Sequence, residues 1–318
     1  MTESQTIFVE TPARLHFGVL DLRGQSGRWF GGIGAAAPDP TLVVSATAAD
    51  TLEAEGDDAE RAAAFARLFL DHYNSKRGVR LHVHRALPSH AGLGSGTQLA
   101  LAVARALAEL HDLSVDAPTL ARAVGRARRS AIGTWTFARG GLVVEGGRHR
   151  DRDDCGPLLA QHAFPPTWRC VVAVPDALSG ISGMTEEDAF AKLPRPPQRE
   201  VEHVAHLVLM ALLPALVEGD LPGFGAALSE IQEINGRWFA KVQGSTFAPG
   251  PSEEIVRRMT EWGASGVGQS SWGPTVYGIV DGEEAGRQLA ERVRELLGGA
   301  GAAYEGPFRT EGARVWRG

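Results

Sequence analysis

The sequence is poor in cysteine and has no long hydrophobic run. It has only two cysteines in 318 residues, Cys155 and Cys170, and neither has the neighbouring Cys or His residues of a zinc site. A disulfide scaffold is therefore not expected, and we expect the protein to reside in a reducing cytoplasm. The longest apolar stretch, residues 207–217, is interrupted by Pro214 and is shorter than the roughly 20 residues of a membrane span. Residues 1–10 lack the apolar core of a secretory signal, so we expect a soluble intracellular protein without a membrane partner.

The chain also lacks an excess of positive charge. Its 32 Lys and Arg residues against 38 Asp and Glu residues give a formal net charge of −6. This balance argues against nucleic acid or anionic lipid as the main partner. A hydrophobic share of 43% is enough to build the core of one large domain or two modest ones, and it excludes a disordered chain.

The clearest structural signal is a strand, a glycine-rich turn and a helix in succession. Apolar residues alternate over residues 79–83, as in a half-buried strand, and recur at helical spacing over the alanine-rich residues 97–110. The intervening segment reads Pro88-Ser89-His90-Ala91-Gly92-Leu93-Gly94-Ser95-Gly96-Thr97-Gln98. Its glycines permit positive φ and a close approach of the backbone, and the first amide groups of a helix attract anions. The pattern predicts an anion cradle with hydroxyl donors at Ser95 and Thr97; the alternative is a plain turn with a capping residue.

Arginines are concentrated in an interval without any acidic residue, between Asp116 and Glu145. The five members are Arg122, Arg126, Arg128, Arg129 and Arg139. A guanidinium group binds phosphate or carboxylate at two points, so a segment without counter-charges is expected to bind an external anion. We expect Arg126 and Arg139 to reach the ligand and the other three to lie on solvated helix faces.

Near the N-terminus, Arg14 and His16 alternate with Leu15 and Phe17. The two polar side chains therefore share one face of a strand. Side by side, a fixed cation and an imidazole can bind a carboxylate and donate or accept a proton. The alternative is a structural hydrogen-bonding pair.

The second half of the chain contains a loop-like segment, residues 263–274, with glycines, two adjacent serines and Trp272. The indole offers a flat apolar wall to an aromatic or sugar ring, with polar groups beside it to orient the ring. Equally, Trp272 can be a buried plug in a tight turn. Upstream, three amide side chains accompany Trp238 and Phe239 and are either ligand-facing or ordinary helix-surface groups: Gln232, Asn235 and Gln243.

The remaining periodicity predicts a mixed architecture with a domain boundary near residue 165. Helices are expected over residues 61–73, 201–217, 224–234, 255–262 and 284–297, and strands over residues 171–174 and 276–280. The Pro-rich residues 194–197 are expected to form a loop. Helices interleaved with strands favour an α/β or α+β second half.

Taken together, these segments resemble the GHMP superfamily, whose Pro-x-x-x-Gly-Leu-Gly-Ser motif matches residues 88–95. Within it the chain is most similar to the beta-ribofuranosylaminobenzene 5′-phosphate synthase family, over residues 13–18, 92–98 and 266–278. The resemblance implies an α+β fold with a ribosomal-protein-like, phosphate-binding domain over residues 1–165 and a ferredoxin-like domain over residues 166–318.

The resemblance also implies an enzyme, a decarboxylating pentosyltransferase of methanopterin biosynthesis. Its reaction joins 4-aminobenzoate or 4-hydroxybenzoate to 5-phosphoribosyl 1-diphosphate through a C–C bond, and it releases carbon dioxide and diphosphate. Mg²⁺ as cofactor and a cytoplasmic homodimer without a nucleic-acid partner are implied as well. Metal ligands cannot be assigned, since no acidic cluster with suitable spacing occurs.

On this hypothesis each predicted site residue has a role. Gly92, Leu93, Gly94, Ser95, Gly96, Thr97 and Gln98 would cradle the diphosphate, and Arg126 and Arg139 would hold phosphate groups. Arg14 and His16 would orient the benzoate carboxylate, with His16 handling a proton. Trp272, Gln269, Ser270 and Ser271 would line the subsite for the aromatic ring or the ribose.

Two competing functions remain at this point. Many GHMP kinases carry an acid about eight positions before a Gly-Gly pair, whereas residues 131–134, before Gly140 and Gly141, contain none. That absence makes an ATP-dependent small-molecule kinase of the same fold the weaker hypothesis. A non-catalytic ligand-binding protein is the third.

Overall fold

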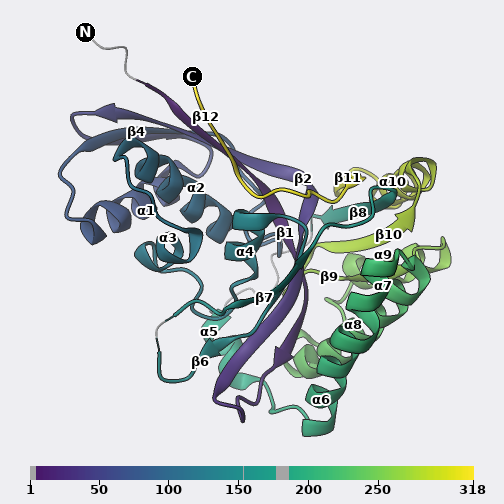
Figure 1. The fold of residues 1–318 in the computed structure, drawn as a ribbon. Coiled ribbons are helices and arrows are strands. Elements are labelled where there is room, and N and C mark those ends of the chain that lie inside the picture. The colour runs from purple at the N-terminus through teal and green to yellow at the C-terminus, as the bar shows by residue number, and fades with distance from the viewer. Residues whose placement is uncertain (1–4, 153, 177–185) are drawn as a thin grey trace.

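The computed structural model describes residues 5–152, 154–176 and 186–318, which form two β-sheets flanked by helices (Figure 1). Two long strands, β1 (Ile7–Asp21) and β2 (Arg28–Ala49), are the backbone of the first sheet and pair antiparallel from Ile7 with Ala46 to Asp21 with Phe30. The strands that pair with them are β4 (Gly78–Arg85), β5 (Leu142–Glu145), β6 (Arg148–His149) and β12 (Arg314–Arg317), while β3 (Leu52–Gly56) pairs with β4 and β7 (Leu158–His162) with β5.

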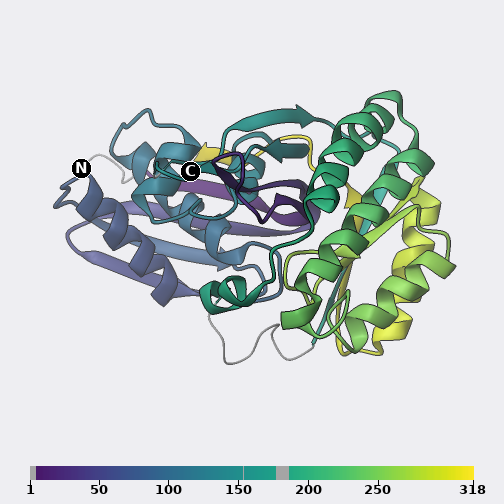
Figure 2. The same cartoon turned by 90° about the horizontal axis from the view of Figure 1, so that it is seen from below.

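Helices of the first half gather on one side of this sheet, as Figures 1 and 2 show. They are α1 (Ala59–His72), α2 (Ser95–Leu110), α3 (Ala117–Ala123) and α4 (Ile132–Arg139). Helix α2 is buried along most of its length, because its small alanine side chains allow β1, β2 and the other helices to approach closely. The predicted strand over residues 79–83 and the predicted helices over 61–73 and 97–110 are confirmed.

The second half contains a four-stranded antiparallel sheet in the order β11-β8-β10-β9. Its strands are β8 (Trp168–Pro175), β9 (Gly266–Gln269), β10 (Val276–Asp281) and β11 (Gly301–Pro307), and the helices packed on it are α8 (Leu221–Gln243), α9 (Pro251–Glu261) and α10 (Glu283–Leu297). In chain order this is the 4-1-3-2 arrangement of a ferredoxin-like sheet, which confirms the α+β fold. The chain changes sheet between β7 and β8, where the boundary at residue 165 is predicted, but β12 returns to the first sheet.

Two predicted elements differ from the structure. The single helix expected over residues 201–217 is divided into α6 (Gln198–Leu207), a π-helical turn over Val208–Leu212 and α7 (Leu213–Glu218), because Pro214 cannot donate a backbone hydrogen bond. Part of the expected loop over residues 263–274 is strand β9, in which Gly268 serves close packing: a Cβ there would lie 2.4 Å from the Tyr277 hydroxyl.

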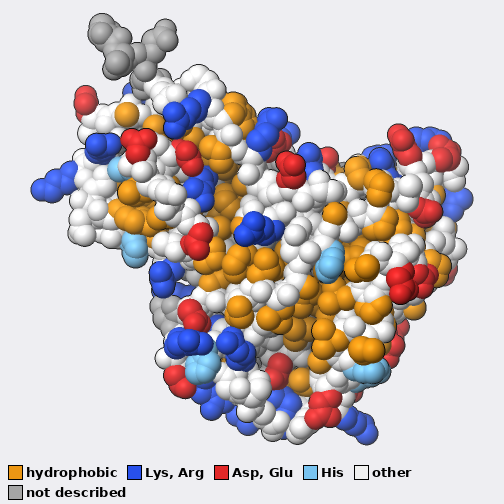
Figure 3. Space-filling view, viewed as in Figure 1, with side chains coloured by type: hydrophobic (Ala, Val, Ile, Leu, Met, Phe, Trp, Pro, Cys, Tyr) orange, Lys and Arg blue, Asp and Glu red, His pale blue; other side chains and the backbone are white. Residues whose placement is uncertain are grey.

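The segment Gln198–Glu218 is the one stretch of the described residues long and apolar enough to cross a bilayer. It packs against α8, and Leu212 and Leu216 are buried. Its outward residues Leu209 and Met210 are exposed. Figure 3 shows hydrophobic side chains gathered over the face on which α7 and α8 lie in Figure 1. Helix α8 thus covers one side of this segment and leaves the other side exposed.

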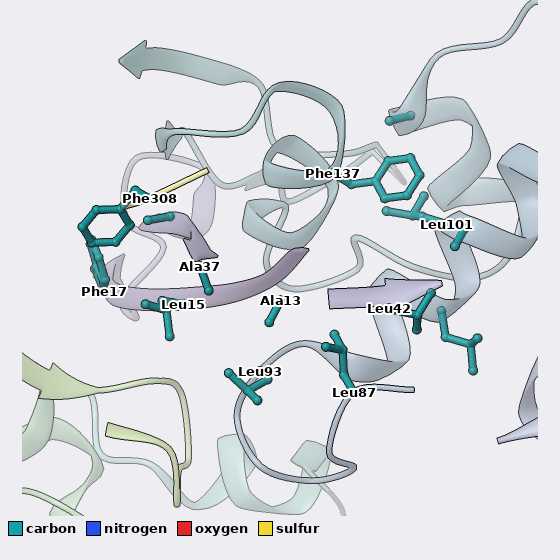
Figure 4. Packing of buried hydrophobic residues seen from close by; sticks show 14 of the residues in the cluster. Ala13, Leu15, Phe17, Ala37, Leu42, Leu87, Leu93, Leu101, Phe137 and Phe308 are labelled. Carbon is teal, nitrogen blue, oxygen red and sulfur yellow. The ribbon is translucent and has the colours of Figure 1, made fainter. Parts of the chain in front are cut away.

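One continuous core joins the two halves. Phe17 of β1 packs against Tyr277 of β10 with ring centroids 4.8 Å apart, and Phe164 stacks on Phe308 at 3.7 Å. Figure 4 shows the side of this core that carries Phe17 and Phe308, together with Leu93 from the glycine-rich loop. The two halves are thereby fixed on either side of β1.

Candidate active site

The glycine-rich loop between β4 and α2 leads directly into the uncapped N-terminus of α2. Gly92 and Gly94 adopt φ of +83° and +74°, and Gly94 precedes the first turn of α2 without any side chain capping the helix. A Cβ on Gly92 would lie 2.2 Å from the Ser270 carbonyl oxygen, and one on Gly94 would lie 2.7 Å from Cγ of Arg14. Both positions thus require glycine, for conformation and for space. The first amide groups of α2 remain available to an anion.

The positive φ expected at Gly96 is not observed: its φ is ordinary, and it lies in the first turn of α2. A Cβ there would lie 2.9 Å from Nη2 of Arg61 and 3.0 Å from Nη2 of Arg126. Two guanidinium groups therefore lie over the helix N-terminus, and glycine makes room for them. Arg61 was not predicted as a site residue, since one arginine on an amphipathic helix carries no distinguishing sign.

Hydrogen bonds tie this loop to β1 and to the second half of the chain. Nη1 of Arg14 donates to the Gly92 carbonyl at 2.6 Å, and the Arg14 amide donates to the Leu93 carbonyl at 3.0 Å. The Ser270 hydroxyl donates to the same Gly92 carbonyl at 2.7 Å and accepts from the His16 amide at 2.9 Å. The loop is thus held in one position from both sides.

Three predicted ligand contacts are not supported by this geometry. Leu93, Gln98 and Ser270 have no exposed surface. Gln98 accepts from the Thr11 hydroxyl at 2.7 Å and donates to the Gly133 carbonyl at 3.0 Å, while Leu93 belongs to the core (Figure 4). These side chains shape the loop from behind.

A cavity of about 830 Å³ opens beside the loop, with walls from both halves of the chain. The predicted site residues in its walls are Arg14, His16, Thr97, Arg126, Gln269, Ser271 and Trp272. Arg139 is not among them: it is exposed in the last turn of α4. Along the axis of α4, Arg139 lies about 10 Å from residue 132.

Arg128 and Arg129, which were expected to face solvent, line the cavity instead. The connection between α3 and α4 that carries these two arginines has positive φ at Gly125 and Ala127. Arg148 of β6 lines the cavity too and lies outside the interval searched in the sequence. Among the described lining residues there are five arginines and no Asp or Glu, so the cavity is strongly cationic.

Four aromatic rings from separate elements meet in the cavity wall; we call them the aromatic cluster, formed by Phe30, Phe190, Phe239 and Trp272. Phe190 of α5 (Glu186–Lys192) is its centre, with ring centroids 5.7 Å from Phe30, 6.0 Å from Phe239 and 5.5 Å from Trp272. All three contacts are edge-to-face. The Arg129 guanidinium lies 5.4 Å from the Phe190 ring centroid. Cation and rings are thus adjacent.

The amide side chains Gln232, Asn235, Gln243 and Gln269 all line the cavity, but they hydrogen-bond mainly to protein. Gln232 and Asn235 donate to the carbonyls of Phe17 and Val19 in β1. Gln269 donates to Gln243 at 2.8 Å, and its oxygen accepts from the Ala248 amide at 2.6 Å. These side chains form a fixed wall of the cavity. The hydrogen bonds of Gln269 to protein are enough to explain its position, without a contact to a ligand.

Burial controls the charge of two titratable groups near the cavity. Desolvation, with Arg14 nearby, lowers the pKa of His16 from 6.5 to about 3, so the imidazole is neutral at physiological pH. Burial raises the pKa of Glu145 from 4.5 to about 7, although its oxygens accept from the Ala131 and Gly147 amides. His16 therefore adds no positive charge to the cavity, and Glu145 fixes the start of α4 from outside the cavity wall.

Comparison with known proteins agrees with this architecture. The family models for the GHMP kinases N terminal domain and the GHMP kinases C terminal match residues 60–137 and 212–299. The homoserine kinase of Cytophaga hutchinsonii superposes with a TM-score of 0.70 at 15% identity, covering 99% of both chains. Mevalonate pyrophosphate decarboxylase from Streptococcus pyogenes gives 0.68 at 15% identity, covering 97% of this chain and 98% of that one. These two structures share the fold alone.

Relatives found by sequence are more similar to this chain than the two solved structures are, and they identify its family. Beta-ribofuranosylphenol 5′-phosphate synthase of Methanothermobacter thermautotrophicus is 36% identical over 313 residues, which cover 92% of this chain and 93% of that protein. The protein of the same name from Archaeoglobus fulgidus is 36% identical over 296 residues, covering 89% and 91%. Similarity of this degree along almost the whole of both chains means that the protein belongs to the beta-ribofuranosylphenol 5′-phosphate synthase family.

Proposed function

We propose that this protein is a beta-ribofuranosylphenol 5′-phosphate synthase, which condenses an aromatic acid with 5-phosphoribosyl 1-diphosphate and releases carbon dioxide and diphosphate. The observation that carries this proposal is the cavity, which combines five arginines with an aromatic cluster and has no carboxylate among its described lining residues. Such a lining suits a polyanionic donor together with an aryl acceptor.

The relatives' name bears on the acceptor. Replacing the carboxylate of 4-hydroxybenzoate by ribose leaves a phenol, whereas 4-aminobenzoate leaves an aniline. We therefore propose 4-hydroxybenzoate as the preferred acceptor and 4-aminobenzoate as its competitor. The aromatic cluster supports a ring-binding subsite, in which the predicted wall at Trp272 is extended by Phe239 and Phe190.

The electron pairs of the reaction can be followed without any loss of a ring proton. The C–O pair at the anomeric carbon leaves with diphosphate, and a ring π pair forms the new bond from the carbon that bears the carboxylate. The pair of the broken C–CO₂ bond then restores aromaticity. The first amides of α2, with Arg61 and Arg126 over them, would stabilise the diphosphate as its charge develops.

This scheme changes the predicted roles of Arg14 and His16. Arg14 donates to the Gly92 carbonyl, which supports a role in positioning the loop. His16 is neutral and buried, and its ring lines the cavity, so it can hydrogen-bond the acceptor without taking a full proton from it. No step of the scheme requires a strong base.

Mg²⁺ prefers oxygen ligands, above all carboxylates. Among the described lining residues no carboxylate is present, and no group of three or more His, Cys, Asp or Glu is placed to bind a metal. The side chains therefore do not fit a protein-bound Mg²⁺, and no step is assigned to it. We expect any Mg²⁺ in the reaction to arrive on the phosphate oxygens of the donor. A cytoplasmic location and a homodimer stay proposals too; sedimentation of the purified protein tests the second.

The decisive experiment mixes the purified protein with 5-phosphoribosyl 1-diphosphate, Mg²⁺ and carboxyl-labelled 4-hydroxybenzoate or 4-aminobenzoate. We expect labelled carbon dioxide and one equivalent of diphosphate. Omitting the donor is the control for spontaneous decarboxylation. Release of no labelled carbon dioxide with either acid, together with ATP consumption in the presence of an alcohol substrate, would replace the synthase by a kinase.

A further inference from the structure

We propose that Arg148 forms a second anion site in the cavity, which binds the 5-phosphate of the ribosyl donor, while the glycine-rich loop binds the diphosphate. This proposal rests on the proposed function and identifies how the donor is oriented. The donor carries phosphate groups on both C1 and C5 of its ribose, so a cavity that binds it in one direction needs two separate anion sites.

Arg148 lies in the cavity wall with part of its hydrogen-bonding capacity unused. Arg148 in β6 pairs with Trp29 in β2, and both side chains line the cavity. Nε of Arg148 and Nε1 of Trp29 are buried, and neither has a hydrogen-bond partner among the described residues. Within those residues no carboxylate forms an ion pair with Arg148. Burial removes part of the hydration of this guanidinium, and an anion bound to the part of it that lines the cavity would replace that hydration.

Other arginines near Trp29 are already engaged. Arg28 donates to the Gly147 carbonyl at 3.0 Å, and Arg150 donates to the Gly24 carbonyl at 3.2 Å while its guanidinium lies 5.9 Å from the Trp29 ring centroid. They add positive potential to this end of the cavity without lining it. Of the three arginines beside Trp29, Arg148 is therefore the one that lines the cavity and can meet a ligand.

Spacing along the sheet separates this site from the glycine-rich loop. Arg14, which holds the loop, pairs with Ala36, and Trp29 precedes Ala36 by seven positions on β2. At the rise of an extended strand this places the two backbone positions about 20 Å apart, before the long side chains reach inward. The aromatic cluster covers the interval, since Trp272 is close to the loop through Ser270 and Phe30 is next to Trp29. An acceptor ring held there would lie beside the ribose.

The acceptor's carboxylate is the other anion available to Arg148, and the chemistry of the reaction argues against that pairing. That carboxylate has to leave as carbon dioxide, and a guanidinium paired with it would stabilise the ground state more than the transition state. The 5-phosphate keeps its charge from substrate to product. A fixed cation can hold it throughout without opposing the reaction.

The test is equilibrium binding to the wild-type protein and to Arg148→Met, with ribose 5-phosphate, inorganic diphosphate and 4-hydroxybenzoate as separate probes. We expect Arg148→Met to lose ribose 5-phosphate affinity by about 10- to 100-fold, the effect of one charge-assisted hydrogen-bonding group, and to keep its diphosphate affinity. Arg150→Met is the matched control, since it removes a neighbouring positive charge that does not line the cavity, and its ribose 5-phosphate affinity should stay within about 3-fold of wild type.

Each outcome is decisive. Ribose 5-phosphate affinity that is equal in Arg148→Met and wild type, or a loss confined to 4-hydroxybenzoate, overturns the second anion site and leaves the synthase proposal standing. Wild-type protein that binds none of the three probes overturns the proposed function itself. Should Arg148→Met fold poorly by thermal unfolding, Arg148→Lys keeps the charge without the planar fork, and a loss of at least several-fold in ribose 5-phosphate affinity is still expected.

Discussion

His16 should make the free protein sensitive to acid, and replacing it by asparagine should remove that sensitivity. Its pKa is about 3 in the folded protein against 6.5 for an unperturbed imidazole, because burial and Arg14 both disfavour the charged form. Below pH 6.5 the unfolded chain takes up a proton that the folded protein refuses until about pH 3, so stability falls as pH is lowered through this window. Between pH 8 and pH 5 the loss attributable to His16 is about 2 kcal/mol.

Urea unfolding at pH 8 and pH 5, without ligand, measures this loss. His16→Asn has its own cost at both pH values, so the quantity of interest is how the difference in unfolding free energy between variant and wild type changes with pH. We expect that difference to move by about 2 kcal/mol in favour of the variant at pH 5. His72→Asn, at an exposed histidine on α1, is the control. A His16→Asn difference that is equal at the two pH values would refute the assignment of a buried, neutral imidazole.

Three further predictions concern other parts of the site. Burial raises the pKa of Glu145 from 4.5 to about 7, so the stability that the protonated carboxyl contributes is present below pH 4.5 and is lost as pH rises to 7. Relative to wild type, the unfolding free energy of Glu145→Gln in urea should therefore rise by about 3 kcal/mol between pH 4.5 and pH 8. Gly94→Ala should cost about 1 to 3 kcal/mol in the same assay and weaken diphosphate binding, because φ is +74° and the new Cβ would displace the Arg14 side chain; unchanged binding would contradict the cradle. Phe190→Leu should raise KM for 4-hydroxybenzoate about 10-fold with KM for the donor unchanged, and Phe164→Leu, in the core away from the cavity, should leave both constants unchanged at a temperature where it is folded.

The parts of the site that follow one local pattern could be predicted from the sequence. The alternation around Arg14 and His16, and the glycines between a strand and an alanine-rich helix, are short-range features whose consequences are local. The structure accordingly places Arg14, His16 and Thr97 in the cavity wall, with Gly92 and Gly94 in the adjoining loop.

Contacts that depend on tertiary structure could not be predicted in this way. Phe190 is surrounded by rings from β2, α8 and the segment after β9, which are far apart in the sequence. Arg139 was chosen for its neighbouring glycines, yet the direction of α4 carries it to the surface, while Arg128, beside the positive φ of Ala127, lines the cavity. Arg148 reaches the cavity through its pairing with Trp29, a register that no local pattern specifies.

The distribution of charge explains how a fold shared with kinases can support pentosyl transfer. Many GHMP kinases carry a carboxylate near the transferred phosphoryl group, which orients the attacking hydroxyl or organises the metal. Here residues 131–134 contain no acid, the Gly133 carbonyl accepts from Gln98, and the nearby Glu145 is turned to the Ala131 and Gly147 amides. A ring carbon that attacks an anomeric centre needs no such base, whereas the departing diphosphate needs positive charge. The arginines that line the cavity supply positive charge for the departing diphosphate. The described walls lack the carboxylate that only phosphoryl transfer would use.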